Sequence, residues 1–131
     1  DAKSLGLIDF DGGGRPDLFF GMNHAAPVIL MNEAGEEDGS PLMISLEGKP
    51  GNLSAIGARV SVEIAGLPRQ TAEVSAGSGY LTQGTPDLFF GWGAGAKADA
   101  SAKVTVRWPD GSVSESLLTR GDGPRHVLTA N

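Results

Sequence analysis

The sequence predicts an all-β fold, an antiparallel β-sandwich or a partly open barrel with an extra N-terminal β-hairpin. Twenty glycines and eight prolines divide the 131 residues into segments of strand length. Residues Arg59–Ile64 alternate strictly, so Val60, Val62 and Ile64 share one face, as in a half-buried strand. Turn signals at such regular spacing are typical of sandwiches and barrels.

Other elements follow from the same patterns. Residues 104–108 repeat the alternation, and Asp110 with Gly111 provides a turn that folds the chain back into residues 112–118. A second turn at residues 65–68 leads from the alternating strand into the next one. Further strands are expected at residues 5–9, 18–20, 28–31, 42–46, 70–74 and 125–129.

One six-residue segment occurs twice, as Pro-Asp-Leu-Phe-Phe-Gly at residues 16–21 and again at residues 86–91. Two copies do not define a repeat array. Each copy is interpreted as a strand that a proline opens and a glycine closes. The alternative is a shared packing role in which the phenylalanines of the two copies face each other across the core.

Composition excludes several classes of site and partner. The chain has no cysteine, which rules out disulfides and thiolate metal sites. A net charge of −6 disfavours binding to nucleic acid. No apolar run approaches the roughly 20 residues of a membrane helix, so membrane insertion is not expected.

A candidate calcium loop lies at residues 9–17. It matches the pattern D-x-D-x-[DN]-G-x-x-D at every specified position except the fifth. Calcium prefers six to eight oxygen ligands, which Asp9, Asp11 and Asp17 would supply together with the carbonyl of Arg15. Gly13 occupies the fifth position, where water or a backbone carbonyl would replace a side chain. The alternative is a glycine-rich hairpin with solvated aspartates.

Three large aromatic side chains could form a binding surface, because Tyr and Trp combine apolar area with a hydrogen-bonding edge. Trp108 continues an alternating strand face and is expected in the core. Trp92 lies between two glycines and either is exposed on a turn or plugs the end of the sandwich. Tyr80 follows a glycine-serine turn. Tyr80 and Trp92 are therefore the candidate residues for a carbohydrate ligand.

Four segments occur in an order that resembles the ASPIC/UnbV family over about residues 42–131. They are IGARV at 56–60, SAGSGYL at 75–81, LFFGWG at 88–93 and RWPDG at 107–111. Residues 1–32 form an N-terminal unit in which about residues 4–32 resemble a terminal FG-GAP or VCBS-type repeat, which in longer proteins would form one blade of a propeller. Residues 33–41 form an acidic linker. The resemblance implies an extracellular or periplasmic binding or adhesion module, with calcium as its candidate metal.

A non-catalytic binding module is therefore the expected function, with a protein or glycan partner. Gly77-Ser78-Gly79 lacks the spacing of a nucleophile elbow, and His24 and His126 lack metal-ligand spacing. The alternatives are a carbohydrate-binding module, a structural spacer or cap for an adjoining propeller, and an enzyme. Open sheet edges in the N-terminal hairpin also predict a homodimer through it.

Overall fold

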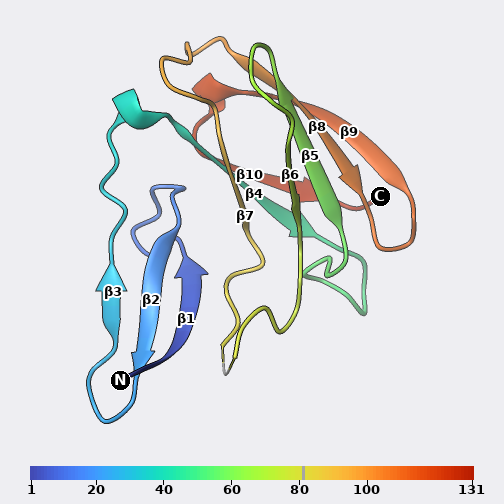
Figure 1. Cartoon of the computed structure of the whole chain (residues 1–131). Coiled ribbons are helices and arrows are strands. Elements are labelled where there is room, and N and C mark those ends of the chain that lie inside the picture. The colour runs from blue at the N-terminus through green and yellow to red at the C-terminus, as the bar shows by residue number, and fades with distance from the viewer. Residues whose placement is uncertain (81) are drawn as a thin grey trace.

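The computed structural model describes residues 1–80 and 82–131, with Glu36 described in its backbone only. This part of the chain forms strands in three sheets and two short 3-10 helices (Figure 1). The strands are β1 (Ala2–Ile8), β2 (Asp17–Met22), β3 (Val28–Leu30), β4 (Pro41–Glu47), β5 (Arg59–Ile64), β6 (Gln70–Glu73), β7 (Leu88–Gly91), β8 (Ser101–Arg107), β9 (Val113–Thr119) and β10 (Arg125–Thr129). The helices are η1 (Glu36–Asp38) and η2 (Arg120–Asp122).

Two of the sheets pack face to face as a β-sandwich, which confirms the predicted fold class. Their strand orders are β10-β4-β7 and β6-β5-β8-β9. Buried residues alternate along β5 and β8, as the sequence pattern predicted for Val60, Val62 and Ile64. One continuous cluster of apolar side chains fills the space between the sheets and includes Leu42, Ile44, Val104 and Val106 in addition to the predicted β5 face.

The strand pairing is not antiparallel throughout. β10 runs parallel to β4, with Arg125 opposite Met43 and Thr129 opposite Glu47. The direction follows from the path of the chain, because η2 and the residues after it return β10 to the start of β4. Met43 N–H donates to the carbonyl of Pro124 at 2.7 Å, where this return meets β4. Alternation within a strand specifies its faces and leaves its direction open, so the sequence could not predict this pair.

A side chain joins the two sheets at the corner between β6 and β7. The Gln70 amide nitrogen donates to the carbonyl of Gly91 at 2.7 Å, and the Gly91 N–H donates to the Gln70 side-chain oxygen at 3.0 Å. Gln70 thereby uses both backbone groups of Gly91 in the way that a neighbouring strand would.

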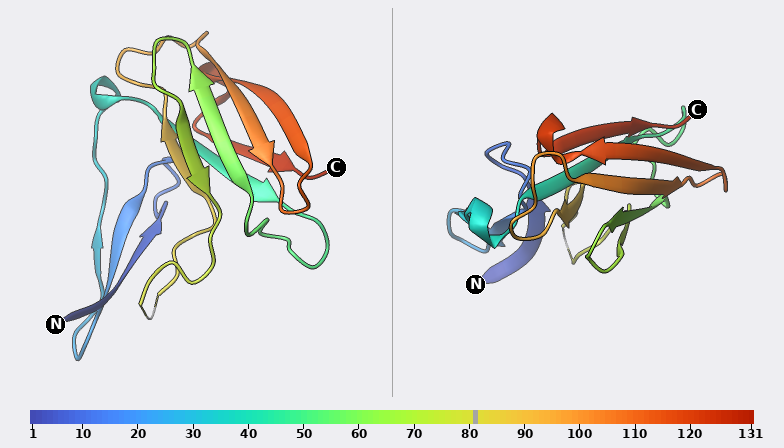
Figure 2. Two further views of the ribbon diagram at one scale, coloured as in Figure 1. Left: turned by 45° about the vertical axis from the view of Figure 1, so that its right-hand side comes forward. Right: turned by 90° about the horizontal axis from the view of Figure 1, so that it is seen from above.

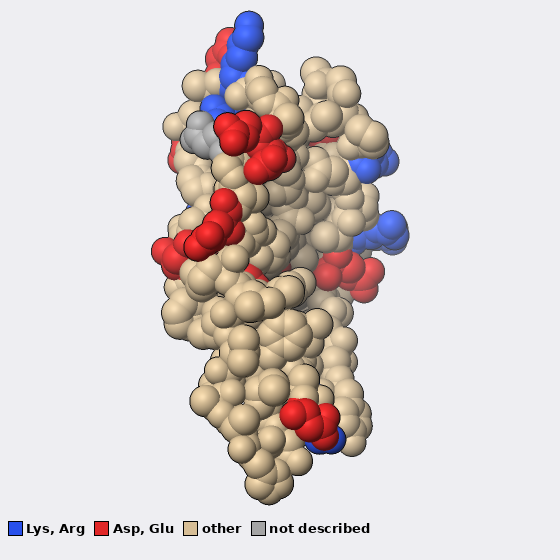
Figure 3. Space-filling view, turned by 60° about the vertical axis from the view of Figure 1, so that its left-hand side comes forward, with Lys and Arg blue, Asp and Glu red and all other residues tan. Residues whose placement is uncertain are grey.

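The N-terminal strands form a three-stranded sheet rather than the predicted hairpin. β2 pairs with β1 on one side and with β3 on the other. This sheet is a single layer beside the sandwich (Figure 2), and Leu5, Leu30 and Phe19 on its faces are all exposed. The lower part of Figure 3, which these strands form, carries few charged side chains. A contact to the sandwich comes from the Thr85 N–H, which donates to the Leu7 carbonyl at 3.0 Å.

Both copies of the duplicated segment contribute a strand, β2 and β7, as the first interpretation predicted. The alternative, in which the phenylalanines meet across the core, is wrong. Phe90 packs against the core between the sheets, whereas its counterpart Phe20 lies outside that core and Phe19 is exposed on the N-terminal sheet.

Candidate metal site

Residues 9–16 form the loop that connects β1 to β2 and reverses the chain, so that Ile8 lies opposite Asp17, the first residue of β2. Gly14 has φ +78°, and a Cβ at this position would lie 2.8 Å from the Pro124 side chain. Glycine is therefore needed at this position for the backbone conformation and for close contact with the segment before β10.

Asp17 is buried and holds the ends of the loop together. One carboxylate oxygen accepts the Phe10 N–H at 2.8 Å, and the other accepts the Asn32 N–H at 2.7 Å. The carboxylate thus joins the loop before β2 to the chain after β3. Each carboxylate oxygen has two lone pairs, so these bonds leave capacity for a cation.

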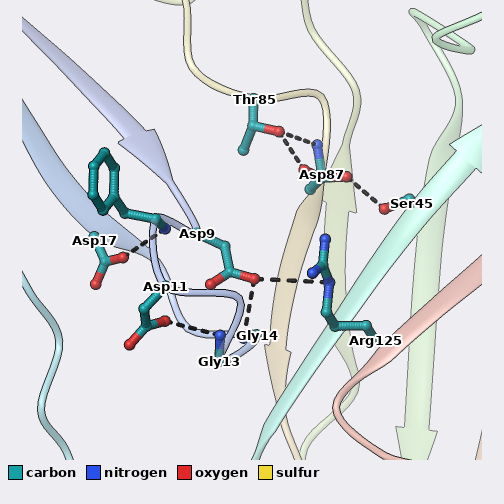
Figure 4. Close-up of polar contacts among 10 residues, drawn as sticks. Asp9, Asp11, Gly13, Gly14, Asp17, Ser45, Thr85, Asp87 and Arg125 are labelled. Atoms are coloured by element: carbon teal, nitrogen blue, oxygen red, sulfur yellow. Dashed lines mark hydrogen bonds and ion pairs between the residues drawn. The ribbon is translucent and has the colours of Figure 1, made fainter.

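Asp9 has an unsatisfied acceptor in a buried place. Its side chain is only 3% exposed. Oδ2 accepts the Gly14 N–H at 3.0 Å and lies 3.8 Å from Nε of Arg125, a contact drawn in Figure 4. Oδ1 is buried and lacks a hydrogen-bond partner within the described residues. A buried carboxylate oxygen without a partner is costly unless a cation or proton neutralises it.

Asp11 completes a group of three acids. One oxygen from each of Asp9, Asp11 and Asp17 lies within 4.8 Å of the others. Asp11 Oδ1 accepts the Gly13 N–H at 2.8 Å, and a Cβ on Gly13 would lie 2.9 Å from that oxygen. The Asp11 carboxylate therefore occupies space next to Gly13 that a fifth-position side chain would need. The set of hard oxygen donors fits calcium better than a transition metal.

Two arginines connect this loop to the rest of the molecule, and neither role was predicted from the sequence. Arg15 donates through its guanidinium to the carbonyls of Gly35 and Gly39, at 3.2 and 2.9 Å. The calcium-loop pattern predicts only a carbonyl ligand from Arg15, and that ligand remains a prediction. Arg125 reaches Asp9 from β10. No sequence signal links an exposed arginine in the last strand to an aspartate more than 100 residues earlier.

The proposed aromatic surface does not form. Tyr80 is 79% exposed, next to the bridge between Gly79 and Thr82, whereas Trp92 is 2% exposed and belongs to the core. A stacking platform needs both rings at the surface, so the prediction that Trp92 contacts a carbohydrate is wrong. Trp92 instead packs in the core between the two sheets. Trp108 is buried as predicted, and its Nε1 donates to Ser114 Oγ at 2.9 Å. Leu81, which ends one of the family-like segments, lies outside the described residues.

The histidines occupy different parts of the fold. His24 lies in the turn between β2 and β3, with φ +58°. His126 lies on β10, and its Nε2 is 3.1 Å from the Gly123 carbonyl oxygen.

Within the described residues, the helices are too short and polar to span a bilayer.

The protein-family comparison assigns most of the sandwich. The model of the family described as ASPIC and UnbV matches residues 48–127, which is more than half of the chain. The chain belongs to the ASPIC and UnbV family. The matched ASPIC/UnbV segment runs from the end of β4 into β10 and includes the predicted RWPDG turn. Residues 1–32 lie outside it, so the FG-GAP or VCBS-type character of the N-terminal sheet remains a resemblance. No curated protein matches the sequence significantly.

Proposed function

We propose that this chain is a non-catalytic extracellular or periplasmic binding module whose β1–β2 loop is stabilised by calcium. The observation that carries the proposal is the buried, unpartnered Oδ1 of Asp9 beside the oxygens of Asp11 and Asp17. Three carboxylates in one small volume repel each other, and a divalent cation removes that repulsion. Arg125 supplies only one positive charge, at 3.8 Å from the other oxygen of Asp9.

The same loop also forms one wall of a groove, so a metal bound to the loop would affect how a partner binds in that groove. A groove of about 450 Å³ is lined on one side by Gly14, Arg15 and Pro16 and on the other by residues 67–70. A bound calcium would fix the backbone of residues 9–17 and thereby the first of these walls. The ion would act by ordering the loop, and a protein or glycan partner would bind in the groove.

A thermal melt in excess EDTA against about 10 mM calcium tests the metal, with magnesium as the ion control. If calcium is present at 100 times its dissociation constant, linkage predicts about 2.7 kcal/mol of stabilisation. In a domain of this size the midpoint then rises by about 5 to 15 °C. Asp9→Asn should abolish the rise, whereas Asp99→Asn, an exposed acid in another turn, should keep it. Equal midpoints in EDTA and calcium would remove calcium from the proposal.

A structural spacer is the second candidate function, and the N-terminal sheet favours it. Leu5 and Leu30 are about half exposed on a sheet that is a single layer, where apolar faces of this kind usually pack against other chains or domains. A spacer would show no calcium-dependent shift and no ligand in the groove. A homodimer through this sheet stays a prediction, and light scattering at high protein concentration would detect it.

A further inference from the structure

The outer face of the β6-β5-β8-β9 sheet places two arginines directly opposite each other. Arg59 on β5 and Arg107 on β8 are Cα partners in the antiparallel ladder. Both are exposed and point away from the core, because Val60 and Val106 next to them point into it. Like charges in opposite positions of two strands destabilise a sheet.

The other cations of this face are neutralised. Arg69 forms an ion pair with Glu63. The Lys103 ammonium lies 2.8 Å from the Glu115 carboxylate, and the hydrogen bond that it donates to this carboxylate raises the pKa of Lys103. These ion pairs neutralise the cations at one end of the face and involve neither Arg59 nor Arg107.

Arg59 and Arg107 differ from these cations because they form no ion pair in the described part of the chain, although the chain has more acidic than basic side chains. The chain has 16 acidic and 10 basic side chains. Across the described ranges, neither Arg59 nor Arg107 has a carboxylate within ion-pair distance. Glu73 is the Cα partner of Arg59 on β6 and still makes no ion pair with it. On its other side, Arg107 faces Val113 of β9, which carries no charge.

We propose that Arg59 and Arg107 form an anion-binding site for the carboxylate or sulfate of an acidic saccharide. Each guanidinium presents a planar fork of N–H donors that matches an oxyanion, and one anion between the two would remove their repulsion. The next row of the ladder offers the hydroxyls of Ser61 and Thr105, which are Cα partners and suit sugar hydroxyls.

The surroundings favour a saccharide over a protein or a nucleic acid. The centre of this face is polar, with Ser61 opposite Thr105 and Glu63 opposite Lys103, whereas a stable protein interface usually has an apolar, aromatic centre. The net charge of −6 opposes a long polyanion such as nucleic acid. Val113, beside Arg107, is exposed and can cover the C–H face of a sugar ring. The site lies in the sandwich and is independent of the calcium loop.

Titration calorimetry in EDTA tests the site with trigalacturonate and a sulfated trisaccharide as probes. Maltotriose is the neutral control, and tetraglutamate tests an acidic peptide. The parent chain should bind at least one acidic saccharide and neither control. Arg59→Gln and Arg107→Gln should each weaken that binding by about tenfold or more. Which probe binds identifies the anionic group as carboxylate or sulfate.

Two further variants make the result specific. Arg69→Gln removes a charge from the same face but from a paired cation, so it should change the affinity less than about twofold. Glu73→Gln removes the nearest acid opposite Arg59 and should strengthen binding. Arg107→Gln should leave the melting midpoint of the free protein unchanged or higher, because it removes a repulsion. Parent-like affinity in both arginine variants, equal binding of maltotriose, or tighter binding of tetraglutamate would each overturn the proposal.

Discussion

The duplicated six residues occupy two different environments, one in the N-terminal sheet and one in the sandwich. In the sandwich copy, Leu88 is buried and Phe90 packs against the core. In the N-terminal copy, Leu18 and Phe20 are only partly buried and lie outside that core, and Phe19 is exposed. The aspartates reverse this order, since Asp17 is buried whereas Asp87 is half-buried.

The difference separates what a local sequence determines from what its surroundings determine. The same residues form a strand in both places, with a proline before it and a glycine at or near its end. Burial of their side chains depends on whether a second sheet covers the strand. The sandwich has that second layer, whereas the N-terminal sheet depends more on polar contacts in its loop.

The largest expected contrast comes from the same substitution in the two regions. Leu42→Ala removes a fully buried side chain of β4 and should lower the free energy of unfolding by about 2 to 5 kcal/mol. Leu30→Ala on β3, where leucine is 52% exposed, should cost less than about 1 kcal/mol. Urea denaturation measures both. Similar losses would show that the N-terminal sheet is covered in solution, for example by a second copy.

A smaller contrast should separate the two aspartates. Asp17→Ala leaves the N–H groups of Phe10 and Asn32 without their acceptor, which should cost about 1 to 3 kcal/mol. Asp87→Ala should cost about 1 kcal/mol or less, because its partners are the hydroxyls of Ser45 and Thr85, which can rotate toward water. Calorimetric melts in EDTA compare the stabilities of the two variants in the absence of bound metal. An equal loss for both variants would contradict it.

The smallest expected effect is a loss of stability at low pH. It arises at the end of the sandwich where the β8–β9 turn meets the chain after β4. Hydrogen bonds from the Ser112 hydroxyl and N–H, and then from Lys49, hold the pKa of Asp110 well below its ordinary value of 3.8. A folded-state pKa below the unfolded value adds stability above pH 3.8, and this is lost as the pH falls through the folded pKa.

Asp110→Asn should therefore melt below the parent at neutral pH, with a difference that shrinks in strongly acid solution. The contact is exposed, so the difference should be small and salt should reduce it. Melting curves of the two proteins across a pH series provide the measurement. A difference that stays constant down to strong acid would rule out the ionised Asp110 as its cause.

Much of the sandwich could be predicted because alternation and turn chemistry are local properties. β5 and β10 have the predicted bounds, and the Asp110-Gly111 turn lies between β8 and β9. Features that depend on distant segments could not be predicted in this way. They include the parallel pairing of β10 with β4 and the burial of Trp92.

The candidate metal site likewise has one feature that could be predicted from local sequence and another that depends on distant segments. The spacing of Asp9, Asp11 and Asp17 within nine residues was sufficient to predict that their carboxylates converge. The burial of Asp9 depends on Arg125 and the segment before it, which arrive from the other end of the chain. A local pattern can identify candidate ligands, but the charges that compete with a metal come from the tertiary fold.

The Gln70 side chain that bonds to Gly91 has a consequence for how copies of this protein meet one another. Strand ends with free backbone groups invite a neighbouring chain to add a strand, which is a route to aggregation. Gln70 occupies both groups of Gly91, so this end of β7 has nothing to offer a second molecule. Deamidation of Gln70 to glutamate would remove the donor to the Gly91 carbonyl, which would then face a carboxylate, so one of these two hydrogen bonds would be lost.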